Sequence, residues 1–296
     1  MKINYDNIPY HYLAIGGGME LSKNNPLISL FIEKSGGKNG IITILPTASD
    51  FGQQVGTLYL ETFRELCLDV EYFLIEKRSD AENPDLLAHL EKSTGVFFTG
   101  GDQLKITSLL GGSSIMNFVH KAKENGVFIA GTSAGASAMS ETMIAWGPSD
   151  SMAKGTLQMS PGIGLLRNLV IDSHFVNRGR ISRLFQLIAQ HPGILGIGLA
   201  EDTGILINVN ETKPKFLVVG SRQVILVDGQ GITHTNIATV KENEPFSLLN
   251  VQVHILGPGY FYDGNTNHIT IPKFIPFLKQ ESKASDLPFR PKFTDY

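Results

Sequence analysis

The sequence predicts an α/β protein whose parallel strands form a central sheet with helices on both faces. Apolar runs typical of buried strands alternate with amphipathic helical stripes along the first half of the chain. The run 127–131 enters a glycine-rich turn and then a series of small residues with helical character, which indicates a strand, a sharp turn and a helix. Hydrophobic residues make up 42% and charged residues 18% of the 296, a composition typical of a globular enzyme with an ample core.

Five strands are expected in this first half, each for a local reason. Uncharged apolar runs predict the strands, Pro46 stops the second one, and apolar residues at helical spacing predict the helices between them. The strands are expected at 12–15, 41–45, 70–75, 96–98 and 127–131, and the helices at 27–33, 55–66, from Pro84 onward and at 115–122. Because right-handed crossovers align the carboxyl ends of such strands, the loops 16–18, 99–103 and 132–135 should meet at one edge of the sheet.

Two glycine-rich loops resemble nucleotide-binding loops only superficially. Glu20 and Leu21 follow the loop 16–18 where the dinucleotide pattern would continue, and Lys38 is followed by Asn39 rather than by Ser or Thr. We therefore expect a plain turn at 16–18, a surface loop at 34–40 and no cofactor.

No linker divides residues 1–272, which we expect to form a single domain, followed by a C-terminal tail at 273–296. A net charge of −3 argues against nucleic acid or an anionic membrane as the main partner. The single cysteine, Cys67, excludes an internal disulfide framework and a cysteine-based zinc site. The N-terminus lacks an apolar leader and no run is long enough to span a bilayer, so the expected location is the cytoplasm.

The turn around Ser133 predicts a nucleophile elbow. Glycines two positions to either side let the strand and the helix approach closely, and the serine is forced into strained geometry that exposes its hydroxyl. The amide of Ala134 then points to where an oxyanion would form, and Gly101, which we rank ahead of Gly100, would bring a second amide. The alternative is a helix N-cap serine after a flexible loop.

A serine nucleophile needs a base and a group that orients the base. Of the eight histidines, His174 stands out because it ends the apolar run 169–173, at the tip of an apparently buried strand. Another apolar run leads into Glu201 and Asp202, either of which would orient the imidazole, the alternative being a carboxylate that caps a turn. No metal is expected, because a site built from Asp172, His174 and Glu201 lacks a second histidine.

The segment after His174 is unusually basic. A helix starting near Arg180 buries Ile181 and Leu184 and leaves Arg180 and Arg183 on another face. Cations in the first turn oppose the helix dipole, so a bound anionic substrate group would explain them, the alternative being surface salt bridges. Asp172, two residues before His174 on the same strand, should point to the same side and would contact a cationic substrate group.

Taken together, the ordered motifs closely resemble the cyanophycinases, which belong to the serine peptidase family that also includes aspartyl dipeptidase (peptidase E). The likeness spans about residues 10 to 260. Its main segments are 98–103, 131–137, 172–183, 198–202, 231–236 and 244–248. Each motif alone is weak, and their order and spacing make the resemblance specific.

The resemblance implies a flavodoxin-like α/β sandwich with a mainly parallel central sheet, often dimeric, in which Ser133 is the nucleophile, His174 the base and Glu201 the orienting acid. The implied reaction is exopeptidase hydrolysis of cyanophycin, multi-L-arginyl-poly-L-aspartate, to β-Asp-Arg dipeptides. An aspartyl or isoaspartyl dipeptidase and a catalytically silent binding protein on the same fold are the alternatives.

The residues suit such a polymer chemically. Arg180 and Arg183, with Arg178 in support, would hold aspartyl carboxylates, while Asp172 and Gln103 would receive polar and cationic groups. The chain departs from the cyanophycinase pattern at one point, where Ser173 replaces the common glutamine before the histidine. The shorter side chain has less reach in the pocket, so this departure bears on the exact substrate more than on the reaction.

Overall fold

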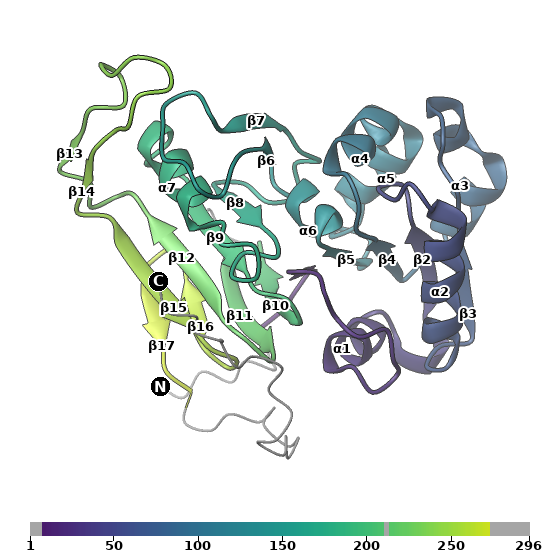
Figure 1. The fold of residues 1–296 in the computed structure, drawn as a ribbon. Coiled ribbons are helices and arrows are strands. Elements are labelled where there is room, and N and C mark those ends of the chain that lie inside the picture. Colours follow the sequence, from purple (N-terminus) through teal and green to yellow (C-terminus); the bar gives the residue numbers. More distant parts are fainter. Residues whose placement is uncertain (1–7, 210–212, 273–296) are drawn as a thin grey trace, which may run out of the picture.

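The computed structural model describes residues 8–209 and 213–272 of the chain. These residues form an α/β fold built on one large mixed sheet and one smaller sheet (Figure 1). The tail expected at 273–296 lies outside the described residues.

The large sheet has nine strands in the order β17-β16-β11-β10-β1-β5-β4-β2-β3. The five strands expected from the first half are all present, and their pairings with one another are parallel: β1 (Tyr12–Ile15), β2 (Ile41–Leu45), β3 (Asp69–Tyr72), β4 (Gly95–Phe98) and β5 (Phe128–Thr132). Four antiparallel strands complete the sheet: β10 (Thr203–Asn208), β11 (Lys215–Gly220), β16 (Phe261–Asp263) and β17 (His268–Thr270). The loops after β1, β4 and β5 therefore meet at one edge, as predicted.

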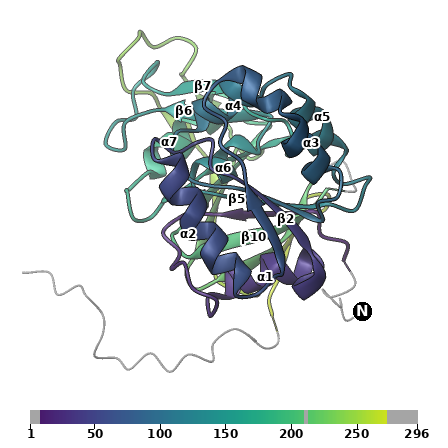
Figure 2. The ribbon, with the colours of Figure 1, turned by 90° about the vertical axis from the view of Figure 1, so that its right-hand side faces the viewer.

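Helices cover both faces of the parallel half (Figure 2). On one face, Leu13 and Ile15 pack with the helices α1 (Pro26–Lys34) and α2 (Gly52–Arg64). On the other, Tyr12 and Ala14 pack with α3 (Pro84–Leu90), α4 (Gln103–Leu110), α5 (Ser114–Lys121) and α6 (Ala134–Ala138). This alternation follows from the two-residue repeat of a strand buried on both faces.

Short helical turns and hairpins connect these layers. They are the 3₁₀ helices η2 (Gly37–Asn39) and η3 (Arg78–Glu82), the hairpin strands β6 (Thr142–Trp146) and β7 (Gln158–Pro161), and the two-residue strands β13 (His234–Thr235) and β14 (Leu248–Leu249).

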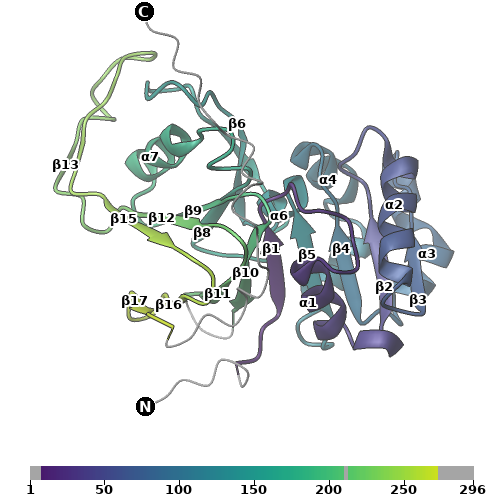
Figure 3. The same ribbon diagram turned by 60° about the horizontal axis from the view of Figure 1, so that its bottom comes forward.

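The strand that ends near His174 does not belong to the large sheet, so the expectation of one mainly parallel central sheet holds for the first half of the chain and not for the second. Four strands form a separate sheet in the order β15-β12-β9-β8 (Figure 3). They are β8 (Leu169–Asp172), β9 (Leu195–Leu199), β12 (Val224–Asp228) and β15 (Gln252–Leu256). A continuous apolar run indicates that a strand is buried, and it does not indicate which strand lies beside it.

The small sheet lies between the antiparallel half of the large sheet and a helix. One face packs Leu199 and Leu226 against Phe216 and other residues of β10 and β11. The opposite face packs against α7 (Ile181–Gln190). The chain crosses from the small sheet to the large one in the short corner between β9 and β10, which contains Glu201. Because β1 pairs with β5 on one side and β10 on the other, the end of β1 lies between the Ser133 turn and this corner.

Candidate active site

Ser133 occupies the turn between β5 and α6 with φ 53° and ψ −114°, and a positive φ is uncommon for serine. The glycines on either side are required by packing: a Cβ on Gly131 would lie 2.5 Å from the backbone of Gly135, and a Cβ on Gly135 would lie 2.4 Å from the Phe98 carbonyl oxygen. The Ser133 side chain makes no capping hydrogen bond to the helix. It is therefore not an ordinary N-cap serine.

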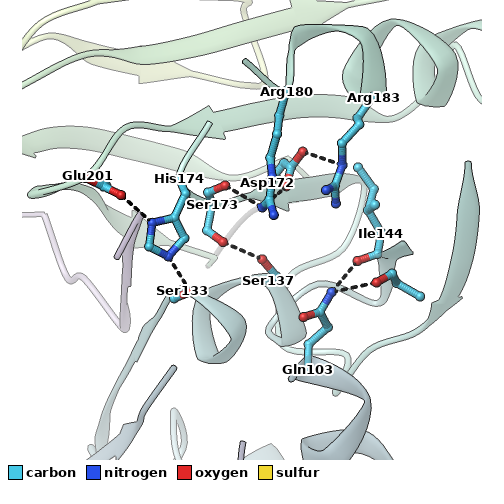
Figure 4. A network of polar contacts seen from close by, with 11 residues as sticks. Gln103, Ser133, Ser137, Ile144, Asp172, Ser173, His174, Arg180, Arg183 and Glu201 are labelled. Carbon is cyan, nitrogen blue, oxygen red and sulfur yellow. Dashed lines mark hydrogen bonds and ion pairs between the residues drawn. The ribbon is translucent and has the colours of Figure 1, made fainter. Parts of the chain in front are cut away.

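A hydrogen-bonded row leads from Ser133 to Glu201 (Figure 4). The Ser133 Oγ lies 2.8 Å from His174 Nε2, and His174 Nδ1 lies 2.8 Å from Glu201 Oε1. Since the carboxylate can only accept, Nδ1 carries the proton and Nε2 is left to accept from the serine hydroxyl. The neighbouring Asp202 points elsewhere and binds Asn25 and Ser221. The structure thus selects Glu201 as the partner of the imidazole.

The surroundings of His174 favour the neutral imidazole. Partial burial lowers the pKa of His174, and the nearby Arg178 and Arg180 lower it further, while the hydrogen bond and charge of Glu201 raise it. The net shift is downward from 6.5. At neutral pH the ring is therefore unprotonated at Nε2 and able to take a proton from Ser133.

Asp172 is buried and holds two of the three nearby arginines. Its Oδ1 accepts from Arg180 Nη1 at 3.2 Å, and its Oδ2 lies 3.0 Å from Arg183 Nε. Burial raises the pKa of Asp172 to about 6 although both arginines lower it. The carboxylate is consequently charged at neutral pH and its two oxygens face arginines of the chain itself. Arg183 is only 6% exposed, so the pairing is not a surface salt bridge.

The remaining predicted substrate residues lie around this cluster. Gln103 donates from Nε2 to the carbonyl oxygens of Ile144 and Ala145, at 2.8 and 3.1 Å. Ser173 is buried, and its hydroxyl lies 3.5 Å from that of Ser137, which donates to it. Arg178 is exposed and its backbone amide donates to the His174 carbonyl.

The loop after β4 does approach the serine. A Cβ on Gly100 would lie 3.1 Å from the Ser133 Cβ, and Gly101 follows with φ +144°. A Cβ on Gly101 would lie 2.0 Å from the Ala48 carbonyl oxygen, so the backbone here tolerates only glycine. Both candidate oxyanion donors, Ala134 and Gly101, therefore lie on segments that border Ser133.

Sequence reasoning missed the contribution of Asn177, and it placed the segment 16–18 at this edge without showing which side chains the segment contacts. The Asn177 side chain accepts a hydrogen bond from the Glu201 amide at 3.3 Å. The segment 16–18 bends at Gly17, and it lies directly against His174 and Glu201. Three successive glycines at a strand end were the available signal, although nothing local showed what would contact them.

The described residues contain no group of three or more His, Cys, Asp or Glu side chains arranged to hold a metal ion. In residues 8–209 and 213–272, no helix has both the length and the apolar character needed to cross a membrane. Cys67 is buried, which raises the pKa of its thiol.

A serine, an imidazole and a carboxylate in hydrogen-bonded sequence form the type of site that serine hydrolases use. Comparison with known proteins gives the particular family. Residues 12–214 match the Peptidase family S51 profile. The chain therefore belongs to peptidase family S51, a family of serine-type peptidases.

Several relatives are similar over most of their length. The chain is 35% identical to the cyanophycinase of Synechococcus elongatus over 90% of this chain and 83% of the relative. It is 35% identical to the cyanophycinase of Geminocystis herdmanii over 86% of this chain and 94% of the relative. It is 36% identical to the cyanophycinase of Trichormus variabilis over 83% of this chain and 83% of the relative. The crystal structure of a peptidase from an acI-B1 actinobacterium has the same fold, with a TM-score of 0.61 and 22% identity over 74% of this chain and 91% of that one.

Proposed function

We propose that the chain is a serine exopeptidase that hydrolyses cyanophycin to β-Asp-Arg dipeptides. The observation that carries the chemistry is the hydrogen-bonded row from Ser133 through His174 to Glu201. The substrate class is supported by the 35–36% identity to proteins named cyanophycinase over most of the chain.

In this mechanism the three residues act as a catalytic triad, and the β5–α6 turn is a nucleophile elbow. The Ser133 Oγ attacks the scissile carbonyl while its proton passes to His174 Nε2, and Glu201 stabilises the imidazolium that results. The imidazolium then protonates the leaving amine as the C–N bond breaks, which leaves an acyl-enzyme ester. Water, deprotonated by His174, attacks the ester and restores the serine hydroxyl.

The backbone amides of Ala134 and Gly101 are the proposed oxyanion hole. Ala134 is the first residue of α6 and directly follows Ser133. Gly101 belongs to the loop that contacts the serine through Gly100. Donors held rigidly beside the attacked carbonyl stabilise the negative charge that develops on its oxygen, an effect typically worth about 3–4 kcal/mol per donor.

Recognition of the substrate is assigned to the arginine cluster. Asp172 holds Arg180 and Arg183 in place, and Figure 4 shows both guanidinium groups on the side of the site that faces Gln103. Because a guanidinium has five donors, each arginine retains further N–H groups for an aspartyl carboxylate. Arg178 supports these two. Asp172 thus acts on the substrate through the arginines, and Gln103 and Ser173 are assigned to the same binding site.

The test is mass spectrometry of the products after incubation with purified cyanophycin. β-Asp-Arg dipeptides should accumulate with the wild-type chain and should be absent with Ser133→Ala. Dipeptides released at the wild-type rate by Ser133→Ala would contradict the mechanism, and an intact polymer with active enzyme would contradict the substrate.

An aspartyl or isoaspartyl dipeptidase is the second candidate, and one observation favours it. Ser173 is buried beside Ser137 where cyanophycinases commonly carry glutamine, so the pocket lacks a long polar side chain at this point. A panel that compares the polymer with α- and β-linked aspartyl dipeptides separates the two. A binding protein without activity is separated from both by a serine-directed covalent probe, which should label Ser133.

We further propose that residues 1–272 form a single catalytic domain, that two copies form a homodimer, and that the enzyme acts in the cytoplasm without nucleic-acid or membrane partners. The net charge of −3 supports the last point. Light scattering of the purified chain measures the oligomeric state.

A further inference from the structure

Three consecutive carbonyl groups at the end of β1 bind the backbone amides of the site. The Ile15 oxygen accepts from the Ser133 amide at 2.9 Å, the Gly16 oxygen from the His174 amide at 2.8 Å, and the Gly17 oxygen from the Asp202 amide at 2.9 Å. Asp202 directly follows Glu201. One short segment is thus bonded to all three parts of the chain that carry the row from serine to carboxylate.

The three donors each have a positive φ, which is uncommon for residues other than glycine. Ser133, His174 and Asp202 have φ values of 53°, 50° and 50°. Such backbone geometry is unfavourable for residues with a Cβ and persists only where the surroundings impose it. The successive carbonyls of Ile15, Gly16 and Gly17 supply such a contact at each of the three positions.

Glycine is required at this segment by the side chains that it faces. A Cβ on Gly17, whose φ is +90°, would lie 2.4 Å from His174 Nε2. A Cβ on Gly18, whose φ is +60°, would lie 2.6 Å from Glu201 Cδ. A Cβ on Gly16 would lie 2.1 Å from the Ala200 carbonyl oxygen. The clashes at Gly17 and Gly18 are with the imidazole and the carboxylate themselves.

We propose that residues 15–18, the β1 template, are the positioning element that aligns Ser133, His174 and Glu201, with Gly17 as the positioning residue for the imidazole. The serine comes from the large sheet, whereas the histidine follows a strand of the small sheet. Because β1 lies between β5 and β10, the segment at its end contacts both the turn that carries Ser133 and the corner that carries Glu201. The inference rests on the proposed catalytic roles of the three residues and adds the segment that holds them in alignment.

The first test measures stability and needs no substrate. Gly17→Ala is made in the wild-type chain and in His174→Ala, with Gly112→Ala as the matched control, because Gly112 also has a positive φ (+75°) and has no atom within 4 Å of an added Cβ. In the wild-type chain, Gly17→Ala should lower Tm by about 5 °C more than Gly112→Ala does. In His174→Ala this excess should vanish, because the imidazole is gone.

An equal loss of Tm in both backgrounds, or failure of Gly17→Ala to fold in both, would overturn the proposal, since backbone strain alone would then explain the glycine. Failure to fold in the wild-type chain with recovery in His174→Ala would support it.

The second test separates positioning from substrate binding. Gly17→Ala should lower kcat at least about 100-fold with KM changed less than about threefold, because displacement of about 1 Å from the reacting geometry has effects of this size. Gly112→Ala should keep kcat within about twofold. Gly18→Ala should shift the acid limb of the pH profile to lower pH, since it moves Glu201 away from His174. An unchanged kcat in Gly17→Ala together with an unchanged pH profile in Gly18→Ala would overturn the proposed role of the β1 template. The proposed peptidase function would still be tested separately, by the loss of activity in Ser133→Ala.

Discussion

The parallel half of the large sheet and the small sheet contribute to the site in different ways. The parallel half supplies Ser133 through a strand, a turn and a helix that are adjacent in sequence, and its two flanking glycines complete the local geometry. The small sheet supplies His174 and Glu201 from loops after two different strands. The geometry of the proposed nucleophile is therefore set by local backbone, while the positions of the proposed base and its orienting acid depend on how the two sheets meet.

The largest expected effect on activity comes from a substitution in the parallel half of the large sheet. Ser133→Ala should lower kcat by about 10⁴-fold or more, because no other hydroxyl occupies the end of the hydrogen-bonded row. The Tm should change little, since the side chain makes no capping hydrogen bond. Steady-state hydrolysis and thermal unfolding measure the two quantities, and a residual rate near that of the wild type would contradict the assignment.

On the side of the small sheet, Glu201→Gln should lower kcat by about 10²–10⁴-fold. The amide cannot stabilise the imidazolium as a carboxylate does, and it can favour the wrong tautomer of His174. Asp202→Asn is the matched control, because Asp202 binds Asn25 and Ser221 instead of the imidazole. Equal losses of kcat in Glu201→Gln and Asp202→Asn would contradict a specific role for the Glu201 carboxylate. They would show instead that activity depends on the structure of the corner between β9 and β10.

The buried cluster on the same side is expected to affect stability as well as binding. Asp172→Asn leaves Arg183 buried without a counter-charge and should lower the free energy of unfolding by about 3 kcal/mol, with a raised KM. Lys23→Gln is the control, because it removes an exposed ion pair with Glu65, and it should change the free energy of unfolding by less than about 1 kcal/mol. Urea unfolding measures both. A loss for Asp172→Asn no larger than that of the control would mean that the cluster does not hold the arginines.

The smallest effect concerns pH. The pKa of His174 lies below 6.5, so kcat/KM should be constant near neutral pH and should fall as the pH drops through that pKa and the imidazole becomes protonated. Arg178 lowers this pKa, so Arg178→Gln should move the acid limb to higher pH. The rate of labelling by a serine-directed probe, measured against pH, avoids any change in substrate affinity. A limb that moved to lower pH would contradict the assignment of the limb to His174.

Much of the first half of the chain was predictable because its structure is local. The apolar strands, the helical stripes between them and the glycines around Ser133 each carry their signal within a few residues. The alternation of these strands with helices then predicted that the strands run parallel. His174 was found as the end of an apolar run, even though the run proved to belong to another sheet.

Local patterns were thus enough to predict the strand–turn–helix at Ser133 and the strand ends that carry the candidate base and acid. They did not show that β8, β9, β12 and β15 form a separate sheet, that Glu201 rather than Asp202 faces the imidazole, or that residues 15–18 bind both sides of the site. The physical reason is that periodicity records which residues are buried, whereas the choice of neighbour depends on contacts between segments that are remote in sequence.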